Sequence, residues 1–178
     1  MQGIKSSPPV GLNAQEMDAF WMRYACLLAE KAAQQGEVPV GAVLVLDNQW
    51  VAEGWNQSIQ NNDPTAHAEM LALQEGGRKI GNYRLLETTL YVTLEPCPMC
   101  AGAMVHARVK RLVYGASDLK TGAAGTVFDL VNEPRLNHQL DVHAGVLESL
   151  CSQQISDFFK MRRQVHKLRK QERKKKTC

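Results

Sequence analysis

The strongest constraint on the fold is an apolar run that has no polar face. Residues 38–46 read VPVGAVLVL and contain no charged or hydrogen-bonding side chain. A β-branched run of this length favours a strand, and a strand that is apolar on both sides must be covered on both faces of its sheet. The chain has 178 residues and is 44% apolar, which is enough for one domain with a substantial core. We therefore expect this strand to lie inside a layered domain.

Strand and helix patterns alternate along the rest of the chain. Asn13 and Glu16 predict a capped helix that ends at Gly36, and the turn at residues 47–48 predicts a hairpin. Alternating elements indicate a layered α/β domain, and the hairpin makes its sheet mixed. The remaining expected elements are strands at 50–55, 89–94, 111–116 and 142–147, a helix from Pro64 and Thr65 to about Gly76, a helix after Cys97, and a terminal helix that starts near Ser152 or Ser156.

Charge is distributed unevenly along the chain. Residues 160–178 contain ten Lys or Arg and one acidic residue, a net charge of +9, whereas the rest of the chain has a net charge of −6. This asymmetry suggests a polyanionic partner, although a solvated helix end would give the same pattern. We expect a flexible leader over residues 1–12, a folded domain over 13–165 and a basic tail over 166–178.

Other features indicate a cytoplasmic protein with no membrane partner. No apolar run approaches the roughly 20 residues of a membrane span, and the first residues lack the apolar core of a secretory signal. The five cysteines therefore suggest reduced thiols rather than a disulfide framework. Cys26 is expected in the core and Cys151 has no evident partner, so only Cys97 and Cys100 are spaced to act together.

Cys97 and Cys100 stand three residues apart at the expected start of a helix. Their sulfurs would share one helix face, where the helix N-terminus favours thiolates. The spacing fits a redox pair or part of a zinc site, but no second pair exists for a four-cysteine site. His67 also opens a helix after a strand, and helices that start at one sheet edge bring their first turns together. Three such ligands and one position open to water are typical of catalytic zinc.

Glu69 lies two residues after His67 in the stretch DPTAHAEML. Helical residues with that spacing differ by about 200° in direction, so the pair can converge only in the first turn of the helix. There, a carboxylate could take a proton from a zinc-bound water and deliver it to a leaving nitrogen. The alternative is that Glu69 only stabilises the helix N-terminus by its charge.

These residues resemble the signature of the zinc-dependent nucleobase deaminases, which is His-x-Glu followed by Pro-Cys-x-x-Cys. The signature stands here at residues 67–69 and 96–100. The similarity extends over about residues 14–165 and is closest to the bacterial tRNA-specific adenosine deaminases. The stretches that carry it are EVPVGAVLV, DPTAHAEM, NYRL, TLYVTLEPCPMCAGAM, KTGAAG and DFFKMRR.

The resemblance implies a three-layer α/β/α cytidine-deaminase-like fold with a five-stranded mixed sheet, usually in a homodimer. It implies one Zn²⁺ per subunit on His67, Cys97 and Cys100, with Glu69 as proton shuttle. The implied reaction is hydrolytic deamination of adenosine to inosine at the wobble position of a tRNA anticodon, typically that of an arginine tRNA. Hydroxide would attack C6 of a flipped-out adenine. The implied substrate contacts are Asn56 and the backbone N–H of Ala68 for the base or its nucleoside, and Asp118 and Phe159 for flanking nucleotides.

Alternatives remain for the substrate residues and for the function. Asn56 could be a turn residue, Asp118 could cap a short helical turn, and Phe159 could be a core residue of an amphipathic helix. KTGAAG lacks the ending of a phosphate loop and is expected to be a tight turn in the pocket wall. A deaminase of a free nucleoside or base (cytidine, cytosine or guanine) would use the same zinc chemistry. A non-catalytic zinc-containing RNA-binding module would not need Glu69, and the nearby His67 makes a thiol redox protein less compatible with the sequence.

Overall fold

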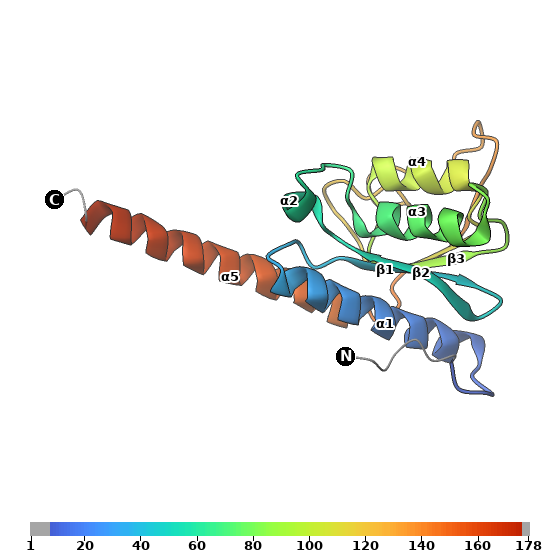
Figure 1. Ribbon diagram of the computed structural model, residues 1–178, viewed down its shortest axis with the longest axis horizontal. Coiled ribbons are helices and arrows are strands. Elements are labelled where there is room, and N and C mark those ends of the chain that lie inside the picture. Colours follow the sequence, from blue (N-terminus) through green and yellow to red (C-terminus); the bar gives the residue numbers. More distant parts are fainter. Residues whose placement is uncertain (1–7, 176–178) are drawn as a thin grey trace.

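A five-stranded sheet lies between two layers of helices in the computed structural model, which describes residues 8–175 (Figure 1). The strands follow the order β2-β1-β3-β4-β5 across the sheet. Strand β1 is antiparallel to β2 and β3, whereas β4 is parallel to β3 and β5. The predicted α/β/α fold with a mixed sheet is therefore confirmed. The strand bounds are β1 (Gly41–Leu46), β2 (Gln49–Trp55), β3 (Thr89–Leu94), β4 (Arg111–Ala116) and β5 (Asp141–His143).

The two faces of the sheet have separate apolar cores. Helices α3 (Ala68–Ile80) and α4 (Pro98–Ala107) cover one face, and α1 (Ala14–Gln34) and the first part of α5 (Glu148–Lys175) cover the other (Figure 1). Along β1, Ala42 and Leu44 belong to the α3/α4 core, while Val43 and Val45 belong to the α1/α5 core. The apolar run at residues 38–46 is thus buried on both faces of the sheet, as its composition predicts.

Local sequence signals set the ends of α1 correctly. The Asn13 side chain accepts a hydrogen bond from the backbone N–H of Glu16, and the Glu16 carboxylate accepts one from the N–H of Asn13. This reciprocal pair is the predicted capping box. The helix ends at Gln34, and Gly36 has a φ of +82°, which a glycine adopts without strain.

Helix α3 continues past Gly76, where the sequence predicts its end. A Cβ atom at position 76 would lie 2.3 Å from Cδ2 of Leu44, so the close packing of α3 against β1 favours glycine at this position. The helix runs on to Ile80 and ends at Gly81, whose φ is +73°. The polar loop predicted at residues 56–65 also contains one short helix, α2 (Ser58–Asn61).

The C-terminal part of the domain differs most from the prediction. Strand β5 covers only Asp141–His143, because Gly145 and Leu147 have positive φ angles that end the extended backbone. Helix α5 then begins at Glu148 instead of near Ser152 or Ser156. Strand β1 similarly begins three residues later than predicted, at Gly41.

Cys151 has a partner that the sequence did not reveal. Its Sγ atom lies 3.7 Å from Sγ of Cys26, and both residues are buried between α1 and α5. The prediction that Cys26 is a core residue is confirmed, and Cys151, for which the sequence shows no evident partner, lies against it as a second free cysteine.

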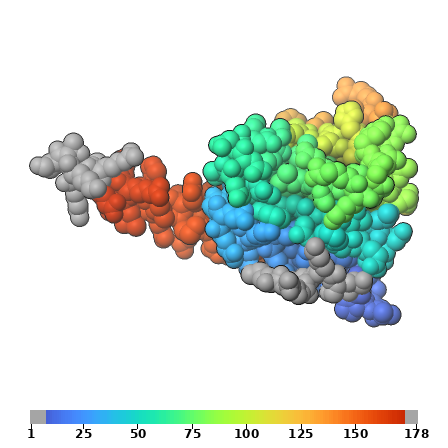
Figure 2. Space-filling model, in the orientation of Figure 1, coloured from blue at the N-terminus to red at the C-terminus, as the bar shows by residue number. Residues whose placement is uncertain are grey.

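Helix α5 extends well beyond the rest of the domain (Figures 1 and 2). It is continuous from Glu148 to Lys175, so the predicted boundary between domain and basic tail falls inside one helix. The predicted leader lies mostly outside the described residues, because the structure describes the chain only from residue 8. None of the helices in residues 8–175 is long and apolar enough to cross a membrane.

Candidate metal centre

Helices α3 and α4 start at the same edge of the sheet. Strand β1 is antiparallel to both β2 and β3, so β2 and β3 run in the same direction. The C-terminal ends of β2 and β3 therefore lie at the same edge of the sheet. Helix α3 follows β2 and α4 follows β3. His67 is the N-cap residue of α3 and Cys97 is the N-cap residue of α4, and neither side chain caps its own helix. Both side chains therefore remain available for another role.

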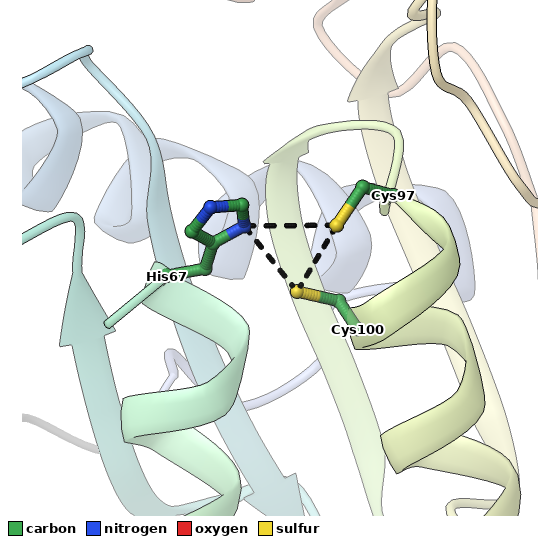
Figure 3. A group of neighbouring side chains, drawn as sticks. All are labelled: His67, Cys97 and Cys100. Atoms are coloured by element: carbon green, nitrogen blue, oxygen red, sulfur yellow. Dashed lines mark hydrogen bonds between the residues drawn. The ribbon is translucent and has the colours of Figure 1, made fainter. Parts of the chain in front are cut away.

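Three donor atoms from these two helix starts form a triangle (Figure 3). Nδ1 of His67 lies 3.7 Å from Sγ of Cys97 and 3.6 Å from Sγ of Cys100, and the two sulfurs are 3.7 Å apart. Zinc–sulfur bonds of about 2.3 Å and zinc–nitrogen bonds of about 2.05 Å at tetrahedral angles imply S···S near 3.8 Å and N···S near 3.6 Å. The donor triangle therefore fits tetrahedral zinc, and His67, Cys97 and Cys100 could hold it with a fourth position left for water.

Electrostatics at the triangle favour a thiolate at Cys97. The hydrogen bond with Cys100 is the largest influence, His67 adds to it, and together they lower the pKa of Cys97 to about 4 despite its burial. The same hydrogen bond, together with burial and the neighbouring Glu69, raises the pKa of Cys100. The hydrogen bond to Cys97 raises the pKa of His67. One thiolate is thus available before a metal binds, and a cation would favour the second.

Glu69 lies in the first turn of α3, where its convergence with His67 was predicted. Glu69 is only 3% exposed and lies close enough to the Cys100 thiol to influence its pKa. Burial raises the pKa of Glu69, although the backbone at the helix start and the nearby His67 act in the opposite direction. Burial beside the donor triangle therefore makes this carboxyl a stronger base than a solvated glutamate.

Asn56 and Ala68 lie next to each other at the entrance of α3. Oδ1 of Asn56 accepts a hydrogen bond of 2.9 Å from the backbone N–H of Ala68. Asn56 follows the last residue of β2 and is half-buried, so it connects the end of that strand to the first turn of α3. The structure brings both predicted base contacts to the metal-binding edge and pairs them with each other.

Asp118 and Phe159 have different surroundings. The Asp118 carboxylate accepts hydrogen bonds from the backbone N–H groups of Lys120 and Thr121 and from the Thr121 hydroxyl, as expected for a capping residue. Phe159 is 43% exposed on α5, and its ring packs edge-on against Phe158. Phe158 is the core residue of the two, so Phe159 is not the core residue that one alternative predicts.

Glu95 is a buried acidic residue near the site, and it is not among the site residues predicted from the sequence. It is 2% exposed and stands between the end of β3 and Cys97. A carboxylate at the end of an otherwise buried strand, on the edge that also carries the donor triangle, is the signal that could have found it.

Comparison with known proteins supports a shared architecture and chemistry. The family model of the cytidine and deoxycytidylate deaminase zinc-binding region matches residues 15–116. A tRNA-specific adenosine deaminase from Haemophilus influenzae is 57% identical over 156 residues, which cover 87% of this chain and 90% of that protein. A tRNA-specific adenosine deaminase from Bacillus subtilis is 46% identical over 157 residues, which cover 88% of this chain and 96% of that protein.

A solved structure agrees with these sequence matches. It comes from a study of A-to-I editing by tRNA:A34 deaminases at the wobble position of transfer RNA, and it is 42% identical with a TM-score of 0.73. The match covers 75% of this chain and 97% of that one. The segment matched by the family model includes both helix starts and therefore all three donors of the triangle.

Proposed function

Because this chain belongs to the family of zinc-binding cytidine and deoxycytidylate deaminases, we propose that it converts adenosine to inosine at the wobble position of a tRNA anticodon. The observation that carries this proposal is the zinc-sized triangle of His67, Cys97 and Cys100 beside the buried Glu69. The relatives that share 57% and 46% identity are tRNA-specific adenosine deaminases, which favours RNA over a free base. Arginine tRNA is the expected substrate, and the cytoplasm the expected location.

Glu69 is the proton carrier in the proposed reaction. Zinc on the donor triangle would lower the pKa of a water molecule to about 7 and so supply hydroxide for attack at C6 of adenine. The Glu69 carboxyl takes up a proton and delivers it to the amino nitrogen at C6, which leaves as ammonia. Burial favours the protonated form of this carboxyl, and its place in the first turn of α3 brings it to the donor triangle. Glu69 is not itself a ligand in this assignment.

Asn56 and Ala68 would hold the flipped-out base or its nucleoside. Their mutual hydrogen bond puts an amide side chain and a backbone N–H side by side at the helix start. The Asn56 amide also carries donors, so the pair can offer both donors and acceptors to a purine edge. When the substrate binds, the Asn56 amide and the Ala68 N–H would exchange their mutual hydrogen bond for hydrogen bonds to the substrate. Both groups would then remain hydrogen-bonded.

Phe159 and the basic face of α5 would contact the RNA outside the catalytic site. Phe159, Arg162, His166 and Arg169 follow helical spacing, so they share one face of α5, and all are exposed. An exposed aromatic ring can stack on a base, and guanidinium groups can bind phosphates without reading sequence. Asp118 would contact another flanking nucleotide.

A homodimer remains part of the proposal, with the groove between α3 and α4 as its interface. The groove has a volume of about 450 Å³ and is lined by Met70, Leu73, Ala103 and Ala107, among others. Tyr83, which is 70% exposed, lies on its rim. A projecting ring next to an apolar groove on one surface suits a two-fold contact, in which each copy fills the groove of the other. Sedimentation of Tyr83→Lys should show a monomer, whereas an unchanged dimer would exclude this interface.

The test uses zinc-loaded protein and matched RNA substrates. An anticodon stem-loop with adenosine at the wobble position is compared with the same stem-loop in which that adenosine is moved by one nucleotide, and with free adenosine, cytidine, cytosine and guanine. Inosine is expected only from the wobble-position adenosine. Turnover of a free nucleoside or base alone would replace the tRNA proposal by the runner-up function. Tight RNA binding without turnover of any substrate would instead support a non-catalytic RNA-binding module.

A further inference from the structure

The loop formed by residues 117–128, here called the Gly-rich loop, is held by one buried carboxylate. Oε2 of Glu95 accepts a hydrogen bond of 3.0 Å from the backbone N–H of Asp118. Oε1 of Glu95 accepts two more of 3.0 Å each, from the N–H groups of Ala124 and Thr126. Three backbone donors from a single loop thus converge on one side chain, and hydrogen bonds to a carboxylate are stronger than those between neutral groups.

The same loop is attached to the chain segment that carries the metal ligand Cys97. The backbone N–H of Ala123 donates to the carbonyl oxygen of Pro96 at 2.8 Å, and the N–H of Glu95 donates to the carbonyl oxygen of Ala116 at 2.8 Å. Ala123 and Ala124 are buried in the same apolar core as Cys100. The position of the Gly-rich loop relative to the donor triangle therefore depends on Glu95 and the residue that follows it.

Gly122 shows how closely the loop is fitted over the carboxylate. A Cβ atom at position 122 would lie 2.3 Å from Oε2 of Glu95 and 2.6 Å from the carbonyl oxygen of Asp118. Any larger residue must push the loop away from Glu95 or displace the carboxylate. The first glycine of KTGAAG is thus explained by the side chain beneath it.

We propose that Glu95 is a positioning residue that fixes the Gly-rich loop, and with it Asp118, at the distance from the donor triangle that the RNA substrate requires. This inference rests on the proposed function. Because the hydrogen bonds of the Glu95 carboxylate all come from the loop, Glu95 should affect how well the RNA is held and leave the metal and the proton carrier in place. A shift of about 1 Å in the loop would misplace the bound RNA without removing any catalytic group.

The test compares Glu95→Gln with a buried carboxylate on the opposite face of the sheet, Asp18→Asn. Glutamine keeps the size of the side chain but turns an NH₂ donor toward one or more backbone N–H groups. We expect unchanged zinc content, a KM for the stem-loop raised by about tenfold or more, and a kcat changed by less than about threefold. Amide hydrogen exchange should become faster in residues 117–128. Asp18→Asn should destabilise the fold without changing KM or exchange in this loop.

Two further variants keep the test decisive. Glu95→Asp retains the charge and should recover part of the lost affinity, which a side chain that only fills space would not explain. Gly122→Ala displaces the loop from the other side and should reproduce the rise in KM even if Glu95→Gln fails to fold.

A normal KM in a folded Glu95→Gln variant with faster loop exchange would overturn the inference, and loss of zinc would show that Glu95 supports the metal site instead. Wild-type protein that deaminates no RNA would refute the proposed function, while the exchange measurement still reports whether Glu95 holds the loop.

Discussion

Each face of the sheet holds two cysteine sulfurs 3.7 Å apart, but only one of these pairs lies in a site that could bind a metal. Cys97 and Cys100 lie at the start of α4 on the α3/α4 face, with Nδ1 of His67 within reach of both. Cys26 and Cys151 lie between α1 and α5 in an apolar core. Within the described part of the chain, no further His, Cys, Asp or Glu completes a metal site around this second pair.

The two pairs do not differ in the pKa pattern of their thiols, because in each pair the pKa of one sulfur is lowered and that of its partner is raised. The pKa of Cys97 is lowered to about 4, chiefly by the Cys100 thiol and then by His67. In the second pair, the hydrogen bond between the thiols and then burial raise the pKa of Cys26, and the same hydrogen bond lowers the pKa of Cys151. The distance between sulfurs therefore does not define a zinc site. A third donor and the start of a helix are what distinguish the pair on the α3/α4 face.

The largest expected difference is in metal content. Cys97→Ser should lower zinc affinity by at least about a hundredfold, because even loss of a residue behind the ligands costs 10- to 100-fold. Cys26→Ser should keep full zinc content, since its sulfur lies on the other face of the sheet. Metal analysis of the purified proteins after dialysis against a mild chelator measures both. Equal zinc loss in the two variants would remove the distinction between the pairs.

The second difference separates metal binding from proton transfer on the α3/α4 face. Glu69→Ala should lower the deamination rate by about 10²- to 10⁴-fold, the usual contribution of a general acid or base, and should retain zinc. Glu75→Ala is the matched control on the same helix, because Glu75 forms surface ion pairs with Arg78 and Lys79. Its activity should stay close to that of the wild type. Zinc loss in Glu69→Ala would contradict the assignment of this residue as a non-ligand.

The third difference concerns the opposite face, from which α5 extends. Deletion of residues 167–178 should weaken stem-loop binding by about tenfold or more at low salt and flatten its salt dependence, because fewer counterions are released on binding. Zinc content should not change, since the donor triangle lies on the α3/α4 face. Binding titrations at several salt concentrations measure the slope. An unchanged slope would show that this segment does not bind phosphates.

The fourth difference is in how well the packing near each cysteine pair tolerates an added methyl group. A Cβ atom at position 115 would lie 2.3 Å from Sγ of Cys151 and 2.9 Å from the carbonyl oxygen of Thr93. Gly115→Ala should therefore lower the free energy of unfolding by about 1–3 kcal/mol. In α4, a Cβ atom at position 102 meets no atom within 4 Å, so Gly102→Ala is the matched control and should be neutral or stabilising. Urea unfolding of both variants decides whether the second cysteine pair is as tightly packed as the structure indicates.

The smallest expected effect depends on pH and again belongs to the α1/α5 face. Burial alone would raise the pKa of Asp18, but hydrogen bonds from Arg111 and Tyr91 outweigh it and hold that pKa below its ordinary value. The stabilisation is therefore present above about pH 4, the ordinary range for aspartate, and is lost as pH falls toward the lowered pKa. Asp18→Asn should cost about 1–3 kcal/mol at pH 7, and the difference from wild type should shrink below about pH 4. A difference that stays constant down to pH 3 would contradict this account.

Much of the metal site is predictable from local sequence. The positions of His67 and Cys97 at helix starts follow from strand, loop and helix patterns, and the helical period places Glu69 in the first turn. The ends of α3 and α5 are less predictable, because Gly76 suggests a helix end that its packing against Leu44 overrides. The helix start at Glu148 likewise follows backbone turns at Gly145 and Leu147 that have no periodic signal.

The sequence by itself determined the layered fold, the chemical class of the site and the positions of His67 and Glu69 at the start of one helix. These depend on periodicity and on residue types within a few positions of one another, which act through local geometry. Only the tertiary structure decided that Cys26 meets Cys151 across 125 residues and that Glu95 lies beneath Gly122. Such contacts arise when whole elements pack at close range, and packing depends on the shapes of surfaces that no local pattern encodes.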